Sequence, residues 1–215
     1  MKSEKILIFG AGGFAREVAW LIEAINKNYE IQGFIDDTHD QHEKIINNIP
    51  VFGLDEAYNR FPFSKIVVAV GDPCGREVVV AKSKNKNFLF ESIIHPKTEM
   101  SKWIEMGEGT IICAGNILTT NINIGKHVHI NLNCTIGHNV NLGDFNTLAP
   151  GVHISGWVNT GKRVYIGTGA VIINGKKDKP IFIEDDVIIG AGACVTKSLL
   201  KNNTYVGVPA KVIRT

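Results

Sequence analysis

The sequence lacks the features that mark several classes of protein. Its 23 Lys and Arg against 21 Asp and Glu leave a formal net charge of only +2 at pH 7, whereas a nucleic-acid-binding domain normally carries a strongly basic surface. The four cysteines form no CxxC pair and have no histidine at zinc-site spacing, so we expect neither a disulfide framework nor a metal. No signal-peptide pattern and no run of about 18 uncharged apolar residues is present. We therefore expect a cytoplasmic protein whose partners include neither nucleic acid nor a membrane.

What the chain does contain is the composition of an ordinary globular protein. With 215 residues, of which 44% are hydrophobic and 20% charged, it can form a packed core. That length accommodates one ordinary domain and a second, smaller one. The two halves differ in pattern, and we expect domains over 1–94 and 95–215.

The second half contains a repeat of six residues. Aliphatic residues recur at every sixth position from Met100 to Ile154, and the register continues to Ile172 with one interruption. It resumes at Ile183, which implies one repeat plus five inserted residues. Neither the period of a helix nor that of an extended strand explains a repeat of six. A three-sided coil of 18 residues does, with the aliphatic side chains inside and Gly or Asn at the corners.

These repeats resemble those of the hexapeptide-repeat acyltransferases. The similarity covers about residues 95–213, including the closing segment Val206-Gly-Val-Pro-Ala-Lys-Val-Ile213. It implies a left-handed parallel β-helix, an exception to the right-handed crossover rule. The handedness is implied by the resemblance alone, because the period does not determine it.

The first half begins with a pattern typical of nucleotide binding. An apolar run at 5–9 leads into residues 10–15, Gly-Ala-Gly-Gly-Phe-Ala, and then into a helical pattern. This spacing fits the fingerprint that brings backbone N–H groups to an anion. A second strand is expected at 31–35, before two aspartates. A domain that ends near residue 94 is too short for both halves of a dinucleotide fold, so we expect a mononucleotide-sized ligand. A tight turn without a ligand is the alternative explanation of the glycines.

Together, the two halves resemble the bacterial UDP-4-amino-sugar N-acetyltransferases and their sialic acid O-acetyltransferase relatives. The resemblance implies a small Rossmann-like domain that holds the nucleotide sugar through Gly12, Gly13, Phe14, Asp36, Asp37 and Gly71. It also implies a coenzyme A groove at Thr147, Gly156, Thr168 and Ala191, and a homotrimer with clefts between adjacent prisms. Phe14 replaces the more polar residue of some members.

Among the seven histidines, His138 is the candidate catalytic base. Acetyl transfer from a thioester needs a base for the acceptor proton and a donor for the oxyanion. His138 follows an inward aliphatic by two residues and so lies at a corner, and the resembling family carries its base there. Asn139 replaces the Glu or Asp of many relatives, so it can fix the imidazole tautomer but supplies no countercharge. Solvation or a structural hydrogen bond accounts for His39, His42 and His95, and two further histidines are expected to face outward, His127 and His129.

One coil beyond His138 lies Gly156. Neighbouring strands are about 4.8 Å apart, so Gly156 should lie one layer above the imidazole, where the resemblance assigns its N–H to the thioester carbonyl. A further coil leads to Asn174, the first residue of the insertion 174–180. The lysines of this insertion could bind the phosphates of coenzyme A, or the insertion could cover the acceptor or be a solvated excursion.

The expected function is N-acetylation of a UDP- or dTDP-linked amino-deoxysugar. Acetyl-CoA is the co-substrate, transfer is direct, and surface-polysaccharide or glycan synthesis is the pathway that the resemblance implies. Two alternatives stay open: an O-acetyltransferase of sialic acid or another sugar hydroxyl, and a non-catalytic nucleotide-binding scaffold. An NAD-linked oxidoreductase would leave the repeats unexplained.

Overall fold

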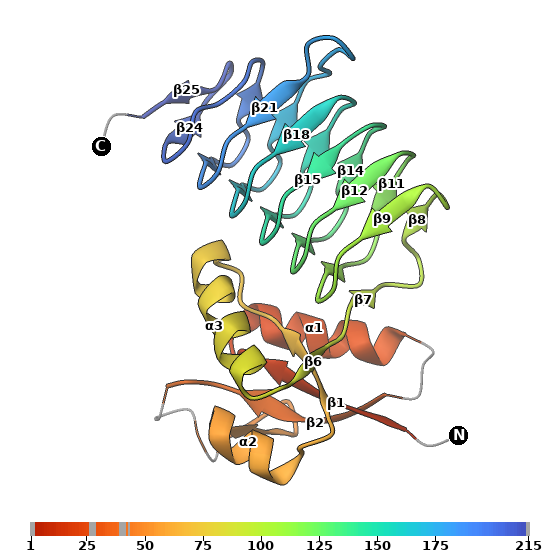
Figure 1. Ribbon diagram of the computed structural model, residues 1–215, viewed down its shortest axis with the longest axis vertical. Helices are drawn as coiled ribbons and strands as arrows, with labels where there is room; N and C mark the ends of the chain where they lie inside the picture. Colours follow the sequence, from red (N-terminus) through yellow and green to blue (C-terminus); the bar gives the residue numbers. More distant parts are fainter. Residues whose placement is uncertain (1–2, 26–28, 39–41, 43, 214–215) are drawn as a thin grey trace. The chain divides into compact units, whose positions relative to one another are not determined.

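The computed structural model describes residues 3–25, 29–38, 42 and 44–213. His39 lies outside these residues. The chain divides into two compact units, Met1–Pro96 and Lys97–Thr215 (Figure 1). The division falls two residues beyond the expected boundary. Within the described ranges, no helix has the length and apolarity needed to cross a membrane.

The N-terminal unit is built on a sheet with the strand order β3-β4-β2-β1-β5-β6. The strands are β1 (Glu4–Phe9), β2 (Tyr29–Ile35), β3 (Ile45–Ile46), β4 (Ile49–Phe52), β5 (Lys65–Val68) and β6 (Leu89–Phe90), followed by β7 (Ile93–Ile94). All pairings in the sheet are parallel except that of β3 with β4. The helices are α1 (Gly13–Ala24), α2 (Leu54–Arg60) and α3 (Pro73–Asn85). Ile6, Leu7 and Ile8 of β1 are fully buried, as expected of a central parallel strand whose two faces are both covered.

The C-terminal unit is a parallel β-helix with three faces (Figure 1). Face 1 consists of β8 (Glu99–Met100), β11 (Ile117–Leu118), β14 (Thr135–Ile136), β17 (His153–Ile154), β20 (Val171–Ile172) and β23 (Cys194–Val195). Face 2 consists of β9 (Ile104–Met106), β12 (Ile122–Ile124), β15 (Asn141–Leu142), β18 (Val158–Thr160) and β21 (Ile181–Ile183). Face 3 contains β10 (Ile111–Ile112), β13 (His129–Ile130), β16 (Thr147–Leu148), β19 (Tyr165–Ile166), β22 (Ile188–Ile189), β24 (Thr204–Val206) and the antiparallel β25 (Lys211–Val212).

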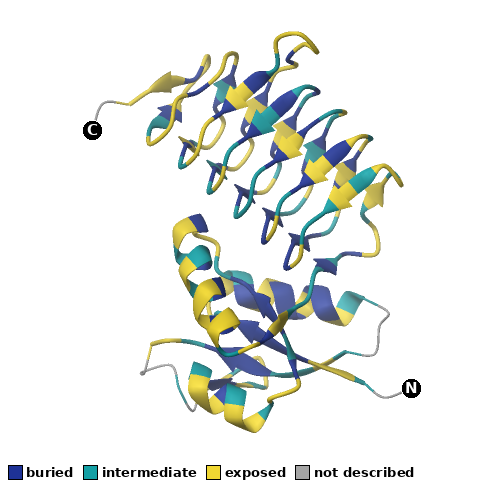
Figure 2. Cartoon of the chain, viewed as in Figure 1, coloured by how far each residue is buried: buried dark blue, intermediate teal, exposed yellow. Residues whose placement is uncertain are grey.

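The pairing register confirms the 18-residue coil. Thr135 pairs with His153, and the same step recurs on all three faces. Val158 pairs with Ile181, so the five inserted residues leave the coil at a corner without shifting the strands. The main-column aliphatics are buried, for example Ile130 and Ile136 at 0% exposure. Figure 2 shows these buried positions alternating with exposed ones along the coils.

Two histidines differ from expectation. His127 and His129 are buried, at 3% and 1% exposure, so the prediction that they face outward is wrong. His127 has a positive φ of 53°, and its ring stacks on Phe145 of the next coil, with 5.3 Å between the ring centroids. The left-handed corner conformation thus directs this imidazole against a neighbouring ring, which a count of repeat positions does not reveal.

Two adjacent isoleucines test which side chains form the core. Ile189 is fully buried, whereas Ile188 on the same strand is 46% exposed. We expect Ile189→Ala to lower the free energy of unfolding by about 2–5 kcal/mol through lost burial and a cavity, and Ile188→Ala to lower it by under about 1 kcal/mol. Urea unfolding followed by circular dichroism measures both. Equal losses would contradict the inward column.

Candidate active site

His138 and Gly156 are in direct contact at one corner of the β-helix, between faces 1 and 2. A Cβ built on Gly156 would lie 2.5 Å from His138 Cε1 and 2.6 Å from Nε2. On the next coil, Asn174 Oδ1 would be 2.9 Å from the same point. The 18-residue step therefore stacks the three residues as expected, and only glycine leaves room for the imidazole.

Asn139 orients the imidazole. Its φ of 57° is tolerated by asparagine better than by most residues, and its Oδ1 lies 3.0 Å from His138 Nδ1. Because an amide oxygen can only accept a hydrogen bond, Nδ1 carries the proton and Nε2 keeps its lone pair. The basic nitrogen is thus the one beside Gly156.

The backbone N–H of Gly156 donates to no other described residue. Its neighbours are paired: Trp157 N–H donates to His138 O at 3.1 Å, and Gly175 N–H donates to Gly156 O at 2.9 Å. At the same repeat position in two other coils, Asp144 and Asp185 accept from the N–H of Lys126 and Lys162. An uncapped N–H beside a basic imidazole can hold a developing oxyanion.

Trp157 and the insertion adjoin this corner. The Trp157 ring meets His138 edge-on, with 6.1 Å between centroids. In the insertion, Lys176 and Lys179 exchange two backbone hydrogen bonds of 3.0 Å and form a tight turn. Lys177 lines a cavity together with Trp157, so at least one lysine of the insertion lies beside the corner.

Two of the predicted coenzyme A contacts lie together at the opposite edge of face 1. Thr168 and Ala191 are exposed at the corner between faces 3 and 1, and Gly192 N–H donates to Thr168 O at 2.8 Å. Face 1 therefore lies between this pair and the His138 corner. Thr147 differs, because its position on face 3 leaves it only 3% exposed.

The predicted nucleotide contacts gather at one edge of the N-terminal sheet. They follow the adjacent parallel strands β1, β2 and β5, whose carboxyl ends form the crevice in which such folds bind ligands. In this group Gly12, Gly13 and Gly71 are exposed, Phe14 is half-buried, and Asp36 and Asp37 follow β2. Gly12 precedes α1 and leaves space, since a Cβ there would meet nothing within 4 Å.

The two aspartates have different partners. Asp36 Oδ1 accepts from Thr38 N–H at 2.8 Å, whereas Asp37 forms an ion pair with Lys82 Nζ at 2.5 Å. Lys82 escaped the sequence analysis because it lies 45 residues away on α3, at a position that no strand or glycine pattern marks.

Arg76 was also missed, although a signal exists four residues earlier. Asp72 caps α3 by accepting from Gly75 N–H at 2.6 Å, and such a cap fixes the first helical turn. Arg76 is fully buried and donates to Val70 O at 2.8 Å and Gly71 O at 3.2 Å. Burial lowers the pKa of Arg76 to about 9, against the opposing charge of Asp72. The guanidinium thus fixes the loop that carries Gly71.

A half-Rossmann unit joined to a β-helix with a histidine beside a free amide defines an acetyltransferase of the hexapeptide-repeat class. Residues 5–83 match the PglD N-terminal domain family. GDP-perosamine N-acetyltransferase of Escherichia coli O157:H7 is 30% identical over 200 residues, covering 86% of this chain and 82% of that protein. The chain therefore belongs to the hexapeptide-repeat sugar N-acetyltransferases.

Solved structures agree over nearly the whole length. A histidine-to-asparagine variant of perosamine N-acetyltransferase from Caulobacter crescentus, in complex with CoA and GDP-perosamine, has a TM-score of 0.89 and 28% identity, covering 98% of this chain and 97% of that chain. The acetyltransferase domain of PglB from Neisseria gonorrhoeae, with acetyl coenzyme A, has a TM-score of 0.87 and 28% identity, covering 99% and 100%. These likenesses confirm the expected α/β domain followed by a left-handed β-helix.

Gly156 provides a test of the corner geometry that does not depend on catalysis. We expect Gly156→Ala to displace the imidazole, because the new methyl group would overlap His138 Cε1, and to lower the free energy of unfolding by about 1–3 kcal/mol. In a His138→Ala background the same change should cost less. Urea unfolding of the two single variants and the double variant measures the difference. An equal cost in both backgrounds would mean that the ring does not occupy this position.

Proposed function

We propose that this chain transfers the acetyl group of acetyl-CoA to the amino group of a nucleotide-linked amino sugar, with His138 as general base. The observation that carries the proposal is the contact of His138 Nε2 with a glycine whose N–H is free to donate. The relatives named for perosamine N-acetylation support the same reaction class.

In this mechanism the two groups act on opposite partners. The acceptor amine attacks the thioester carbonyl carbon while His138 Nε2 takes a proton from the nitrogen. The carbonyl oxygen becomes an oxyanion that accepts from Gly156 N–H. When the tetrahedral intermediate collapses, the carbon–sulfur bond breaks and the thiolate of coenzyme A takes the proton back. The products are the N-acetyl sugar and free coenzyme A.

Asn139 acts as a positioning residue. By accepting from Nδ1–H, it keeps the lone pair on Nε2 and the ring beside Gly156. An amide does not stabilise an imidazolium as a carboxylate does, so its contribution is orientation rather than charge.

Coenzyme A is assigned to face 1. Thr168 and Ala191 border that face on one side and Gly156 borders it on the other, so a thioester at Gly156 has its longer portion directed along the face. The insertion lysines are placed to meet its phosphates. Thr147 belongs to the assigned contacts through family resemblance, with its burial as the argument against a direct role.

The N-terminal unit is assigned the nucleotide. Gly12, Gly13, Phe14 and Gly71 would face the phosphates and sugar, and Asp36 and Asp37 the nucleoside. The expectation of UDP or dTDP is widened by the relatives named for GDP-perosamine, so guanine joins uracil and thymine as a candidate base.

A homotrimer in the cytoplasm is part of the proposal. Exposed aliphatic side chains on face 1, such as Ile117 and Val171 at 43% and 38% exposure, favour contact with further copies. Acetyl-CoA and nucleotide sugars are both cytoplasmic metabolites, so the substrates place the reaction there.

The catalytic assignment is tested by His138→Ala and Asn139→Ala with GDP-, UDP- and dTDP-linked amino sugars. We expect His138→Ala to lower kcat about 10²–10⁴-fold and Asn139→Ala to lower it roughly tenfold, the value of one hydrogen bond. Because Asn139 acts through the ring, the double variant should be no slower than His138→Ala. Calorimetry should show acetyl-CoA affinity retained. Near-normal turnover of His138→Ala, or transfer only to hydroxyl acceptors, would contradict the proposal.

Two glycines separate nucleotide binding from folding. Gly12→Ala adds a methyl group in open space, where we expect it to obstruct the phosphates and weaken nucleotide-sugar binding roughly tenfold, about 1.4 kcal/mol, without loss of stability. Gly10 has φ +115°, and a Cβ there would lie 2.9 Å from Ala69 O, so Gly10→Ala should destabilise the unit by roughly 1–3 kcal/mol. Calorimetry and urea unfolding distinguish the two effects. Unchanged binding in Gly12→Ala would remove the turn from the proposed site.

A further inference from the structure

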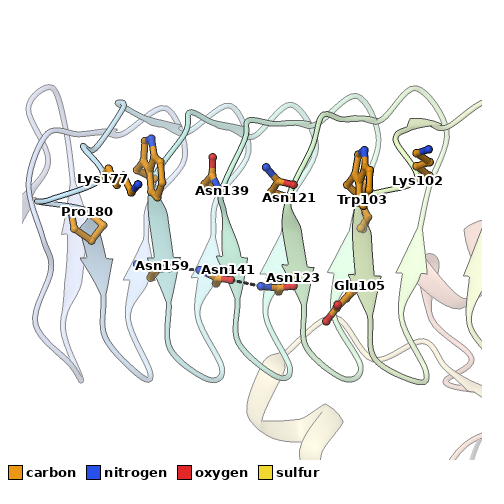
Figure 3. A pocket seen from close by; sticks show the side chains of 12 residues that line it. Lys102, Trp103, Glu105, Asn121, Asn123, Asn139, Asn141, Asn159, Lys177 and Pro180 are labelled. Carbon is orange, nitrogen blue, oxygen red and sulfur yellow. Dashed lines mark hydrogen bonds between the residues drawn. The ribbon is translucent and has the colours of Figure 1, made fainter.

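Face 2 carries a groove that the proposed reaction does not account for. A cavity of about 480 Å³ extends along this face from Lys102 on the first coil to Lys177 and Pro180 of the insertion. Figure 3 shows its side chains in two parallel rows that run across the coils. Only Asn139 and Trp157 belong also to the His138 corner.

The floor of the groove is a ladder of asparagine amides. Asn123 Nδ2 donates to Asn141 Oδ1 at 2.6 Å, and Asn141 Nδ2 donates to Asn159 Oδ1 at 2.5 Å (Figure 3). The three residues are paired by the backbone register of β12, β15 and β18, which fixes the amides in one orientation. Each amide keeps hydrogen-bonding capacity beyond the ladder, and Asn123 and Asn141 are exposed.

Indole rings mark the two ends of the second row. Trp103 is 62% exposed and Trp157 is half-buried, and both line the groove with Asn121 and Asn139 between them. The two tryptophans are three coils apart, which corresponds to about 14 Å at the usual strand spacing. A single hexose ring is too short to reach from one indole to the other.

From this arrangement, we propose that the groove binds a short neutral oligosaccharide of two or three hexoses. Sugar rings present C–H groups that pack on flat indole faces and hydroxyls that both donate to and accept from amides. A ladder fixed by backbone pairing loses little side-chain freedom on binding. This is the combination of apolar platforms and oriented polar groups that a carbohydrate requires.

The charge distribution argues against a nucleotide in the same place. Lys102, Glu105 and Lys177 lie toward the ends of the groove, and no charged side chain lines the stretch of floor between them. A diphosphate needs cationic side chains or converging N–H groups, which the amide floor does not supply. The core of an interface between protein copies is typically apolar, whereas this floor is polar and neutral.

The proposal is tested on the part of the groove remote from the reaction. Full-length protein is applied to a microarray of neutral bacterial oligosaccharides of two to four sugars, and hits are measured by calorimetry. We expect Trp103→Ala and Asn123→Ala each to weaken binding at least tenfold. Both should retain acetyl transfer to the nucleotide sugar, since neither residue lies at the His138 corner. Trp20→Ala is the matched control, because Trp20 is a 53% exposed tryptophan of the N-terminal unit, and it should bind as the unchanged chain does.

Two results would overturn the proposal. One is the absence of binding to any oligosaccharide on the array, or binding that Trp103→Ala and Asn123→Ala leave intact. The other comes from Asn123→Arg, which places a long cation on the floor. If light scattering shows that this variant has a lower assembly mass than the unchanged chain while circular dichroism shows it folded, the groove is an interface between copies. Because acetyl transfer is measured separately, failure of the groove leaves the proposed reaction standing, and the converse holds.

Discussion

Parallel pairing of strands 18 residues apart, with an aliphatic side chain pointing inward in nearly every repeat, is the constraint on which the β-helix and its site depend. Each buried Ile, Leu or Val contributes about 1.5–3 kcal/mol, but only when the next coil covers it. The same register decides which outward residues meet. His138 contacts Gly156, and Asn123, Asn141 and Asn159 form a ladder, because each is one coil from the next. Site geometry is thus a consequence of core packing.

The corners supply what regular strands cannot. Asn121, Asn139 and Trp157 occupy equivalent corner positions with φ of 53°, 57° and 59°. Asparagine tolerates this region, whereas a bulky residue there is strained at roughly 1–3 kcal/mol. Trp157 retains the conformation because its N–H donates to His138 O on the coil below. The strained backbone places the indole edge-on to the imidazole and at the mouth of the groove, so the only tryptophan among these three corners connects the two sites.

How far the sequence predicts such features depends on the range of the interaction that fixes them. A fixed step of 18 places Gly156 above His138 and Thr168 beside Ala191, and the gap in the aliphatic column locates the insertion, so these relations follow from counting. Burial of His127 and the ion pair of Asp37 with Lys82 do not, because they depend on side-chain direction and on a distant helix. The asparagine ladder is intermediate: its spacing is visible in the sequence, but without the face to which each residue points, the pattern reads only as corner composition.

The neutral residue after His138 changes how the site must work. A carboxylate at this position would both orient the ring and stabilise its charged form, whereas Asn139 supplies orientation alone. Stabilisation of the oxyanion then carries more of the reaction, and a single positioned donor is worth about 10²–10³ in kcat. That places a strict demand on the position of Gly156 N–H, which is set by backbone pairing and not by a mobile side chain. Because the five inserted residues leave at this corner without changing the pairing of β18 with β21, the chain can elaborate its surface beside the site while the donor stays fixed.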